Sequence, residues 1–268
     1  MGKFLYTTLM YYSPEAVVEL ERGRQEVLGE LEDLWLPLAR DLVRSLTNER
    51  AQEYLVHGIC RRLITIGRCI DNIFTIFPAD RTNLLKQEER SDVQINLHAF
   101  FINLHGVPDN LAWIFVLENE LAINPMRVGL FSRDKEMKSH LPKEVRVYLR
   151  SKTIKTWHQA YAKNYRDALA HRIPLYVPPA IYSPEHEQRY GELETEISAA
   201  MRQDDYNRVQ TLTDEQDSIG GICPAFRQSF LDEDACSPMN LHSQIIADAR
   251  TVMEIVNVLR PHLIRQSG

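Results

Sequence analysis

Residues 152–171 read KTIKTWHQAYAKNYRDALAH, and this stretch decides the fold because its apolar residues recur at α-helical spacing. At about 100° per residue, the apolar side chains fall on one stripe, made of Ile154, Trp157, Tyr161, Tyr165 and Ala168. The roughly opposite face carries polar and mostly cationic side chains, namely Lys152, Lys155, Gln159, Lys163 and Arg166. We therefore expect a long helix whose apolar stripe packs against other helices and whose outer face is basic.

Three side chains that can bind anions or move protons gather at the end of this helix. Asp167 and His171 are four residues apart, so the carboxylate can hydrogen-bond the imidazole and set its tautomer and charge. Arg166 lies about 140° from His171 on an ideal helix. For both to act on one phosphate, either the helix ends before His171 or a second subunit supplies the other half. The Ile173-Pro174 step favours an early end, since the residue before a proline avoids helical dihedral angles.

Helical periodicity also dominates the rest of the chain. Ser13 is the expected N-cap of the first helix, with Pro14 at its first position. The pattern predicts further helices over about 38–57, over about 60–77 before Pro78, over about 95–120, and from Ser237-Pro238 to about Leu259. Few segments alternate with a period of two, so the sequence predicts an all-α protein.

Two histidines in the predicted helix over 95–120 repeat the motif Ile-Asn-Leu-His. His98 and His105 share a helix face about 10 Å apart, which is too far for both to bind one metal ion. His105 and Asp109 supply only one imidazole and one carboxylate, so no metal site and no cofactor is expected. We expect core histidines with satisfied hydrogen bonds.

The chain is expected to form a single all-helical domain over residues 1–268. Its core would comprise about 38–175 plus 237–264, with extra helices at the N-terminus. The most polar part of the sequence, about 177–236, is interpreted as an insertion with its own helices before the C-terminal helix.

The composition is that of a globular protein, with 44% hydrophobic and 25% charged residues and a net charge of −6. Charge is unevenly spread: residues 135–172 hold ten Lys or Arg and three acids, a local +7, which leaves −13 for the rest. This segment is either a surface for an anionic partner or a solvated helix face.

Several classes of protein are disfavoured by what the sequence lacks. It has no glycine-rich phosphate loop and no apolar run of roughly 18 residues, so no membrane association is expected. The four cysteines show no zinc spacing, which favours free thiols in the cytoplasm.

The segment RDALAH, residues 166–171, resembles the Arg-polar-x-x-x-His signature of the HEPN superfamily. The resemblance covers the helix of residues 152–172, the buried helix near 95–120 and the closing helix near 238–260. It implies an up-down helical bundle. Many members of that superfamily are metal-independent ribonucleases that act as dimers, and others are inactive binding modules. Active members usually carry Asn beside the Arg, whereas this chain has Asp167.

The resemblance implies a homodimeric endoribonuclease, acting as a toxin or defence effector and restrained by an antitoxin or regulatory protein. The ribose 2′-OH would attack the adjacent phosphorus, with His171 as acid or base, Arg166 neutralising the phosphorane and Asp167 orienting. The expected RNA contacts are Lys152, Lys155, Lys163 and Arg172. Two alternatives stay open: a non-catalytic HEPN-like module that binds a nucleotide, RNA or protein, and an unrelated helical protein in which RDALAH is a surface helix end.

Overall fold

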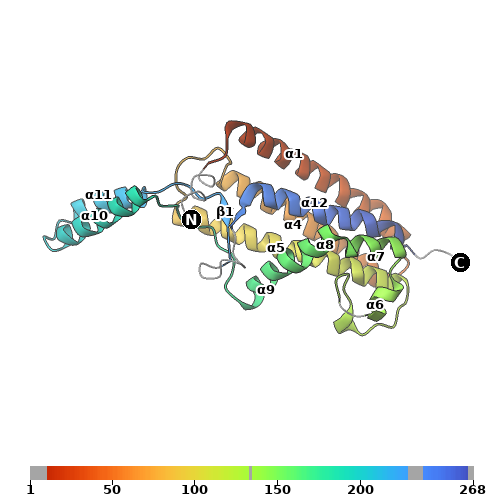
Figure 1. Cartoon of the computed structure of the whole chain (residues 1–268). Coiled ribbons are helices and arrows are strands. Elements are labelled where there is room, and N and C mark those ends of the chain that lie inside the picture. Colours follow the sequence, from red (N-terminus) through yellow and green to blue (C-terminus); the bar gives the residue numbers. More distant parts are fainter. Residues whose placement is uncertain (1–10, 133–134, 229–237, 265–268) are drawn as a thin grey trace.

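Four long helices form the centre of the computed structural model, which describes residues 11–132, 135–228 and 238–264. They are α1 (Pro14–Pro37), α4 (Arg61–Ile76), α5 (Gln87–Glu118) and α12 (Leu241–Leu259), packed side by side (Figure 1). The helical prediction is confirmed, including the start of α1, where the Ser13 side chain accepts a hydrogen bond from the backbone of Ala16. The core extends to α1, whose buried residues are Leu20, Val27, Leu31 and Leu34.

The break between the first two long helices lies at residues 46–48, between the two breaks that the sequence suggested near residues 37 and 58. Helix α1 continues through the π-helical turns of η1 (Leu38–Leu42) into α2 (Val43–Ser45). A second continuous helix follows, made of α3 (Glu49–Glu53), η2 (Tyr54–Cys60) and α4. The predicted division of 38–57 from 60–77 is therefore wrong, although the predicted stop before Pro78 is confirmed.

Glu118 explains the position of this break. Its buried carboxylate accepts hydrogen bonds from the backbone N–H groups of Thr47 and Asn48, at 3.1 and 2.7 Å. The Asn48 side chain in turn caps α3. Backbone groups freed by the chain reversal are thus satisfied by a partner about 70 residues away, which local periodicity does not reveal.

Helix α5 begins eight residues before its predicted start and continues through Pro108 to Glu118. By length and composition it is the one described helix that could cross a membrane, but 56% of its most apolar window is buried inside the protein. That burial is typical of the central helix of a bundle.

A set of shorter helices covers one side of the bundle. After the short 3₁₀ turn η3 (Pro125–Arg127) come α6 (Lys135–His140) and α7 (Lys143–Arg150), at one end of the molecule (Figure 1). The predicted helix over residues 152–171 then follows as α8 (Lys152–Thr156), the π-helical η4 (Trp157–Ala162) and α9 (Lys163–His171).

The polar segment after residue 177 carries two helices of its own. Helices α10 (Pro184–Met201) and α11 (Tyr206–Asp217) form a hairpin that projects from the end of the bundle opposite α6 and α7 (Figure 1). The hairpin has a separate small core of Leu193, Ala200 and Leu212. The chain returns through β1 (Ala225–Phe226), which pairs antiparallel with β2 (Met239–Asn240), into α12.

Helix α12 starts at Leu241, slightly later than predicted, and Ser237 lies outside the described residues. Three of the four cysteines, Cys60, Cys69 and Cys223, are free and buried, as expected, while Cys236 also lies outside the described part.

Candidate functional site

Helix α9 does not bring Arg166 and His171 together within one chain. The helix includes His171, and only at Arg172 does the backbone become extended, with φ −136° and ψ −156°. The helix therefore does not end before His171, and that route to convergence is excluded. The side chains of Arg166 and His171 therefore remain about 140° apart around the helix axis.

The predicted pairing of Asp167 with His171 is replaced by another one. Asp167 accepts a hydrogen bond from Lys163 Nζ and lies 3.1 Å from Arg166 Nη1. Burial alone would raise the pKa of Asp167, but the Lys163 bond and the Arg166 charge hold it below its usual value. The His171 side chain is exposed and makes no hydrogen bond or ion pair with the described residues.

Arg166 and Lys163 instead lie near a different histidine, His158, which η4 places in a buried position. Its ring stacks on Phe131 with centroids 3.8 Å apart, and the His105 ring lies 5.7 Å away. Burial lowers the pKa of His158 to about 4, with a further contribution from neighbouring charges, so the imidazole is neutral at pH 7.

The prediction of satisfied core histidines is confirmed for one residue of the pair on α5. His98 Nε2 lies 2.6 Å from the backbone oxygen of Leu175. His105 approaches Asp109 at 3.6 Å, but its buried Nε2 has no hydrogen-bond partner, so the prediction is wrong for His105.

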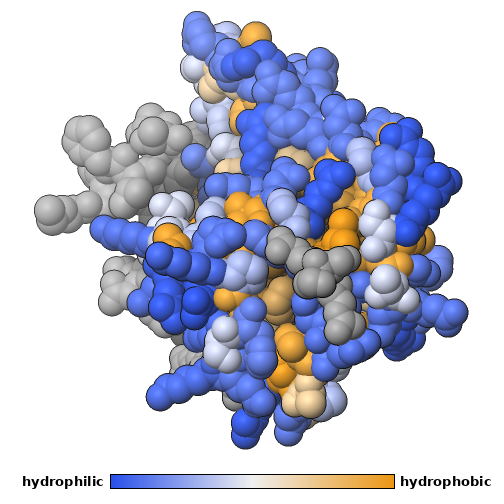
Figure 2. Space-filling view, turned by 90° about the vertical axis from the view of Figure 1, so that its right-hand side faces the viewer, coloured by the Kyte–Doolittle hydropathy of each residue, from blue (hydrophilic) through white to orange (hydrophobic). Residues whose placement is uncertain are grey.

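Beside His158 lies a pocket of about 400 Å³, which we call the basic pocket. Its cations come from three consecutive helices: Lys138 from α6, Arg146 and Arg150 from α7, and Lys155 from α8. The remaining lining residues are Leu130, Phe131, Leu141, Leu149, His158 and Gln159. The end of the molecule that carries α6 and α7 shows apolar residues between hydrophilic ones (Figure 2).

The cations of the basic pocket are not neutralised within the described chain. No carboxylate from the described residues lines the pocket, and the four side chains make no ion pair or hydrogen bond there. Two acids of the same cationic segment, residues 135–172, are engaged with other residues: Glu144 lies 3.4 Å from His262, and Asp167 binds Lys163. The uncompensated local charge leaves this pocket suited to an anion.

The pocket wall is fixed by a buried carboxylate on α12. Asp248 accepts hydrogen bonds from Trp157 Nε1 at 2.8 Å, Tyr161 Oη at 2.5 Å and Gln244 Nε2 at 3.0 Å. Burial raises the pKa of Asp248 to about 6, against the effect of these three donors. Trp157 and Tyr161 belong to the predicted apolar stripe, which packs on the core as expected. The anchor holds η4, and so His158 and Gln159, against the bundle.

Of the residues predicted from sequence as RNA contacts, only Lys155 lines the basic pocket. Lys163 is engaged by Asp167, while Lys152 and Arg172 are exposed at the two ends of the α8–α9 helix. Sequence reasoning missed Lys138, Arg146, Arg150 and His158. The excess of +7 over residues 135–172 was the signal that pointed to this region.

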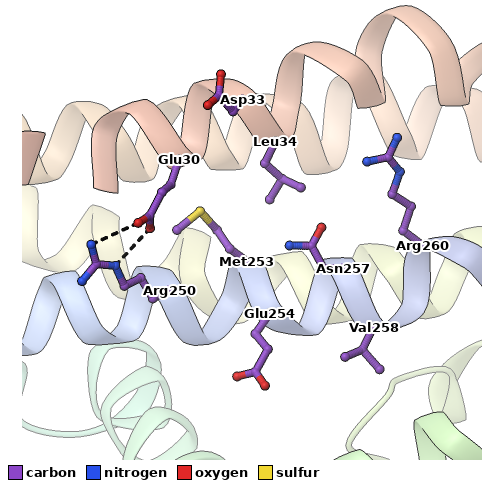
Figure 3. Close-up of a pocket in the computed structure, with 9 residues that line it drawn as sticks. All are labelled: Glu30, Asp33, Leu34, Arg250, Met253, Glu254, Asn257, Val258 and Arg260. Carbon is purple, nitrogen blue, oxygen red and sulfur yellow. Dashed lines mark hydrogen bonds and ion pairs between the residues drawn. The ribbon is translucent and has the colours of Figure 1, made fainter. Parts of the chain in front are cut away.

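A larger cavity, of about 610 Å³, lies between α1 and α12 (Figure 3). We call it the interhelical groove. Arg250 crosses it and donates hydrogen bonds to Glu30 at 3.0 and 3.1 Å and to Glu26 at 2.9 Å. Its charged lining mixes signs, with Glu30, Asp33 and Glu254 beside Arg250 and Arg260. It therefore has no net preference for an anion.

Among the described residues, no group of three or more His, Cys, Asp or Glu side chains has the geometry to hold a metal ion. Comparisons with protein-family models, with curated proteins and with solved structures find no match to this chain.

Proposed function

We propose that the protein is a non-catalytic helical module that binds RNA, with a backbone phosphate held in the basic pocket. The observation that carries this proposal is the set of four cations with no carboxylate partner in the described chain, drawn from α6, α7 and α8. Phosphate contacts by Lys and Arg supply a large share of the affinity of proteins for nucleic acids, and arginine matches a phosphate with two parallel hydrogen bonds.

The rest of the molecule favours a localised contact over general binding to polyanions. The chain carries a net charge of −6, so RNA is repelled by most of its surface and attracted at residues 135–172. Exposed Lys152 and Arg172 extend the cationic face along the helix that borders the pocket. This arrangement supports binding of a single strand that follows α8 and α9.

The experiment is a fluorescence anisotropy titration with a labelled single-stranded RNA at fixed salt. We expect the double variant Arg146→Gln/Arg150→Gln to bind about tenfold or more weakly, because each lost phosphate contact removes a charge-assisted hydrogen bond. Arg202→Gln is the matched control, since Arg202 caps α10 at the opposite end of the molecule. Equal affinities for wild type and the double variant would contradict the proposal. DNA of the same sequence tests whether the 2′-OH is read.

A second candidate is the HEPN-type endoribonuclease suggested by RDALAH. The exposed, unengaged imidazole of His171 favours it, because a second copy of the chain could bring its Arg166 to that side chain. The proposal comprises a HEPN-like bundle, a homodimer and action in the cytoplasm under the control of an antitoxin or regulatory protein. Wild type would then leave 2′,3′-cyclic phosphate ends on RNA in the presence of EDTA, and His171→Ala would not. A monomeric mass in sedimentation analysis would count against it.

A further inference from the structure

We propose that the basic pocket takes the phosphorylated end of an RNA strand, a terminal phosphomonoester, in preference to an internal phosphodiester. This inference rests on the proposed RNA binding and names the part of the RNA that the pocket recognises.

The first argument is the match of charge. An internal phosphodiester carries one negative charge, whereas a phosphomonoester carries about −1.5 to −2 at pH 7 and offers three acceptor oxygens. Four cations from three helices line one pocket, with no carboxylate from the described chain among them. That is more positive charge than one diester neutralises, and it suits a group with three acceptors.

The second argument is the form of the pocket. Its volume of about 400 Å³ lies at the small end of the range for sites that enclose a ligand, roughly 300–1,000 Å³. Besides the cations, the lining offers four apolar side chains, Leu130, Phe131, Leu141 and Leu149. A cationic part beside an apolar part matches a terminal nucleotide, with its phosphate on the cations and its sugar and base on the apolar wall.

The third argument is the buried imidazole in the pocket wall. His158 is neutral in the free protein, which follows from burial together with the charges around it. The charged and titratable groups near it are His105 and Asp109 on α5, Lys163 and Arg166 on α9, and the four cations of the basic pocket. A bound dianion would offset this positive field and offer the ring an acceptor. His158 is then expected to take up a proton and donate a hydrogen bond to the phosphate.

The test compares three short RNAs of one sequence, with a 5′-phosphate, with a 3′-phosphate, or with hydroxyl groups at both ends. We expect one phosphorylated RNA to bind about tenfold or more tightly than the hydroxyl form. Whether this is the 5′-phosphate or the 3′-phosphate RNA identifies the end that the pocket binds. Arg146→Gln/Arg150→Gln should abolish the difference, while Arg202→Gln should retain it.

The outcomes separate this inference from the broader proposal. If all three RNAs bind equally well and all are weakened by the double variant, the RNA-binding function stands and the preference for a strand end is overturned. If none of the three binds, both proposals are overturned.

Calorimetry at pH 7.5 in buffers of different ionisation enthalpy tests the role of His158. Wild type should take up protons on binding the phosphorylated RNA. His158→Gln should bind without that uptake, with its melting temperature recorded to show that it is folded. Proton uptake that persists unchanged in His158→Gln would overturn the role given to this side chain.

Discussion

The interhelical groove and the basic pocket both contain two arginines, but the arginines differ in their partners. In the groove, Arg250 makes two hydrogen bonds to Glu30 (Figure 3) and one to Glu26, so its charge is satisfied by carboxylates on the neighbouring helix. In the basic pocket, Arg146 and Arg150 have no such partner among the described residues. A paired arginine joins two helices, whereas an unpaired one keeps its donors available for a ligand.

The comparison also shows why cavity size alone does not identify a site. The groove is larger, at about 610 Å³ against about 400 Å³, yet its charges largely offset one another. The smaller pocket keeps an excess of positive charge. The composition of the lining is therefore the better guide to which cavity binds an anion.

The largest expected effect concerns Asp248, which lies on the same helix as Arg250 but anchors the wall of the basic pocket. Asp248→Ala should destabilise the protein by about 3 kcal/mol, because three buried donors lose their acceptor. Urea unfolding measures the change. Asp248→Asn is the milder control, as it keeps an acceptor oxygen. A loss below about 0.5 kcal/mol for the alanine variant would show that the anchor is dispensable.

The stability of the folded protein should fall on acidification, because buried imidazoles, one of them in the basic pocket, are neutral in the folded state. The folded-state pKa values of His158 and of His242, a buried residue in the first turn of α12, are lowered to about 4, chiefly by burial. The folded protein therefore binds fewer protons than the unfolded chain between about pH 6.5 and 4, and stability falls as pH falls through this window. Asp248, with its pKa raised to about 6, acts in the opposite direction between about pH 6 and 4.

Because two imidazoles oppose one carboxyl, we expect a net loss on the order of 2 kcal/mol between pH 7 and pH 5. His158→Gln should reduce this loss by more than half. Chemical denaturation of wild type and His158→Gln at pH 7 and pH 5 measures both losses of stability. An identical pH dependence in the variant would mean that His158 is already charged or is exposed in the folded protein.

Replacing arginines by glutamine in each cavity separately tests the comparison directly. Arg146→Gln/Arg150→Gln should weaken RNA binding about tenfold or more, whereas Arg250→Gln should leave affinity unchanged. Fluorescence anisotropy titrations of one RNA with wild type and with each of the two variants measure the affinities. Equal losses in both variants would indicate a general effect of net charge and remove the distinction between the cavities.

Arg250→Gln should instead affect stability, and only modestly. The Arg250 side chain is 41% exposed, so its ion pairs with Glu26 and Glu30 are screened by water and are worth roughly 1 kcal/mol or less. Thermal unfolding at low and high salt measures this, with a smaller difference between the proteins at high salt. A loss of several kcal/mol would show that the pairs are more important than their exposure suggests.

The smallest effect is expected for His171. Its side chain is exposed and unengaged in the described structure, so His171→Ala should change stability by less than about 0.5 kcal/mol and leave RNA affinity unaltered. Unfolding and anisotropy measure both quantities. A variant that binds RNA normally but loses an RNA-cleaving activity of the wild type would favour the endoribonuclease over the binding module.

Much of the helical fold could be predicted because it depends on local patterns. The start at Ser13-Pro14, the stop before Pro78 and the apolar stripe from Ile154 to Ala168 all follow from caps, prolines and periodicity. The break at residues 46–48 could not be predicted, since it is stabilised by Glu118 from α5. A partner about 70 residues away leaves no mark on the local sequence pattern.

The charge of the sequence indicated the region of the candidate site but not most of the residues that line it. The excess of +7 pointed to residues 135–172, yet the wheel of one helix identified only Lys155 among the pocket cations. Lys138, Arg146 and Arg150 belong to separate short helices, and the turns between those helices determine which side chains meet. The prediction that Asp167 would orient His171 did not foresee that Lys163, also four residues away, competes for the same carboxylate.

The most direct test of the account is the salt dependence of RNA binding in wild type and in Arg146→Gln/Arg150→Gln. For single strands, each phosphate neutralised contributes about 0.7 to the slope of log affinity against log salt. We predict a slope smaller by about 1.4 in the double variant, with Arg250→Gln matching wild type. An unchanged slope in the double variant would contradict the claim that the unpaired arginines of the basic pocket bind phosphate.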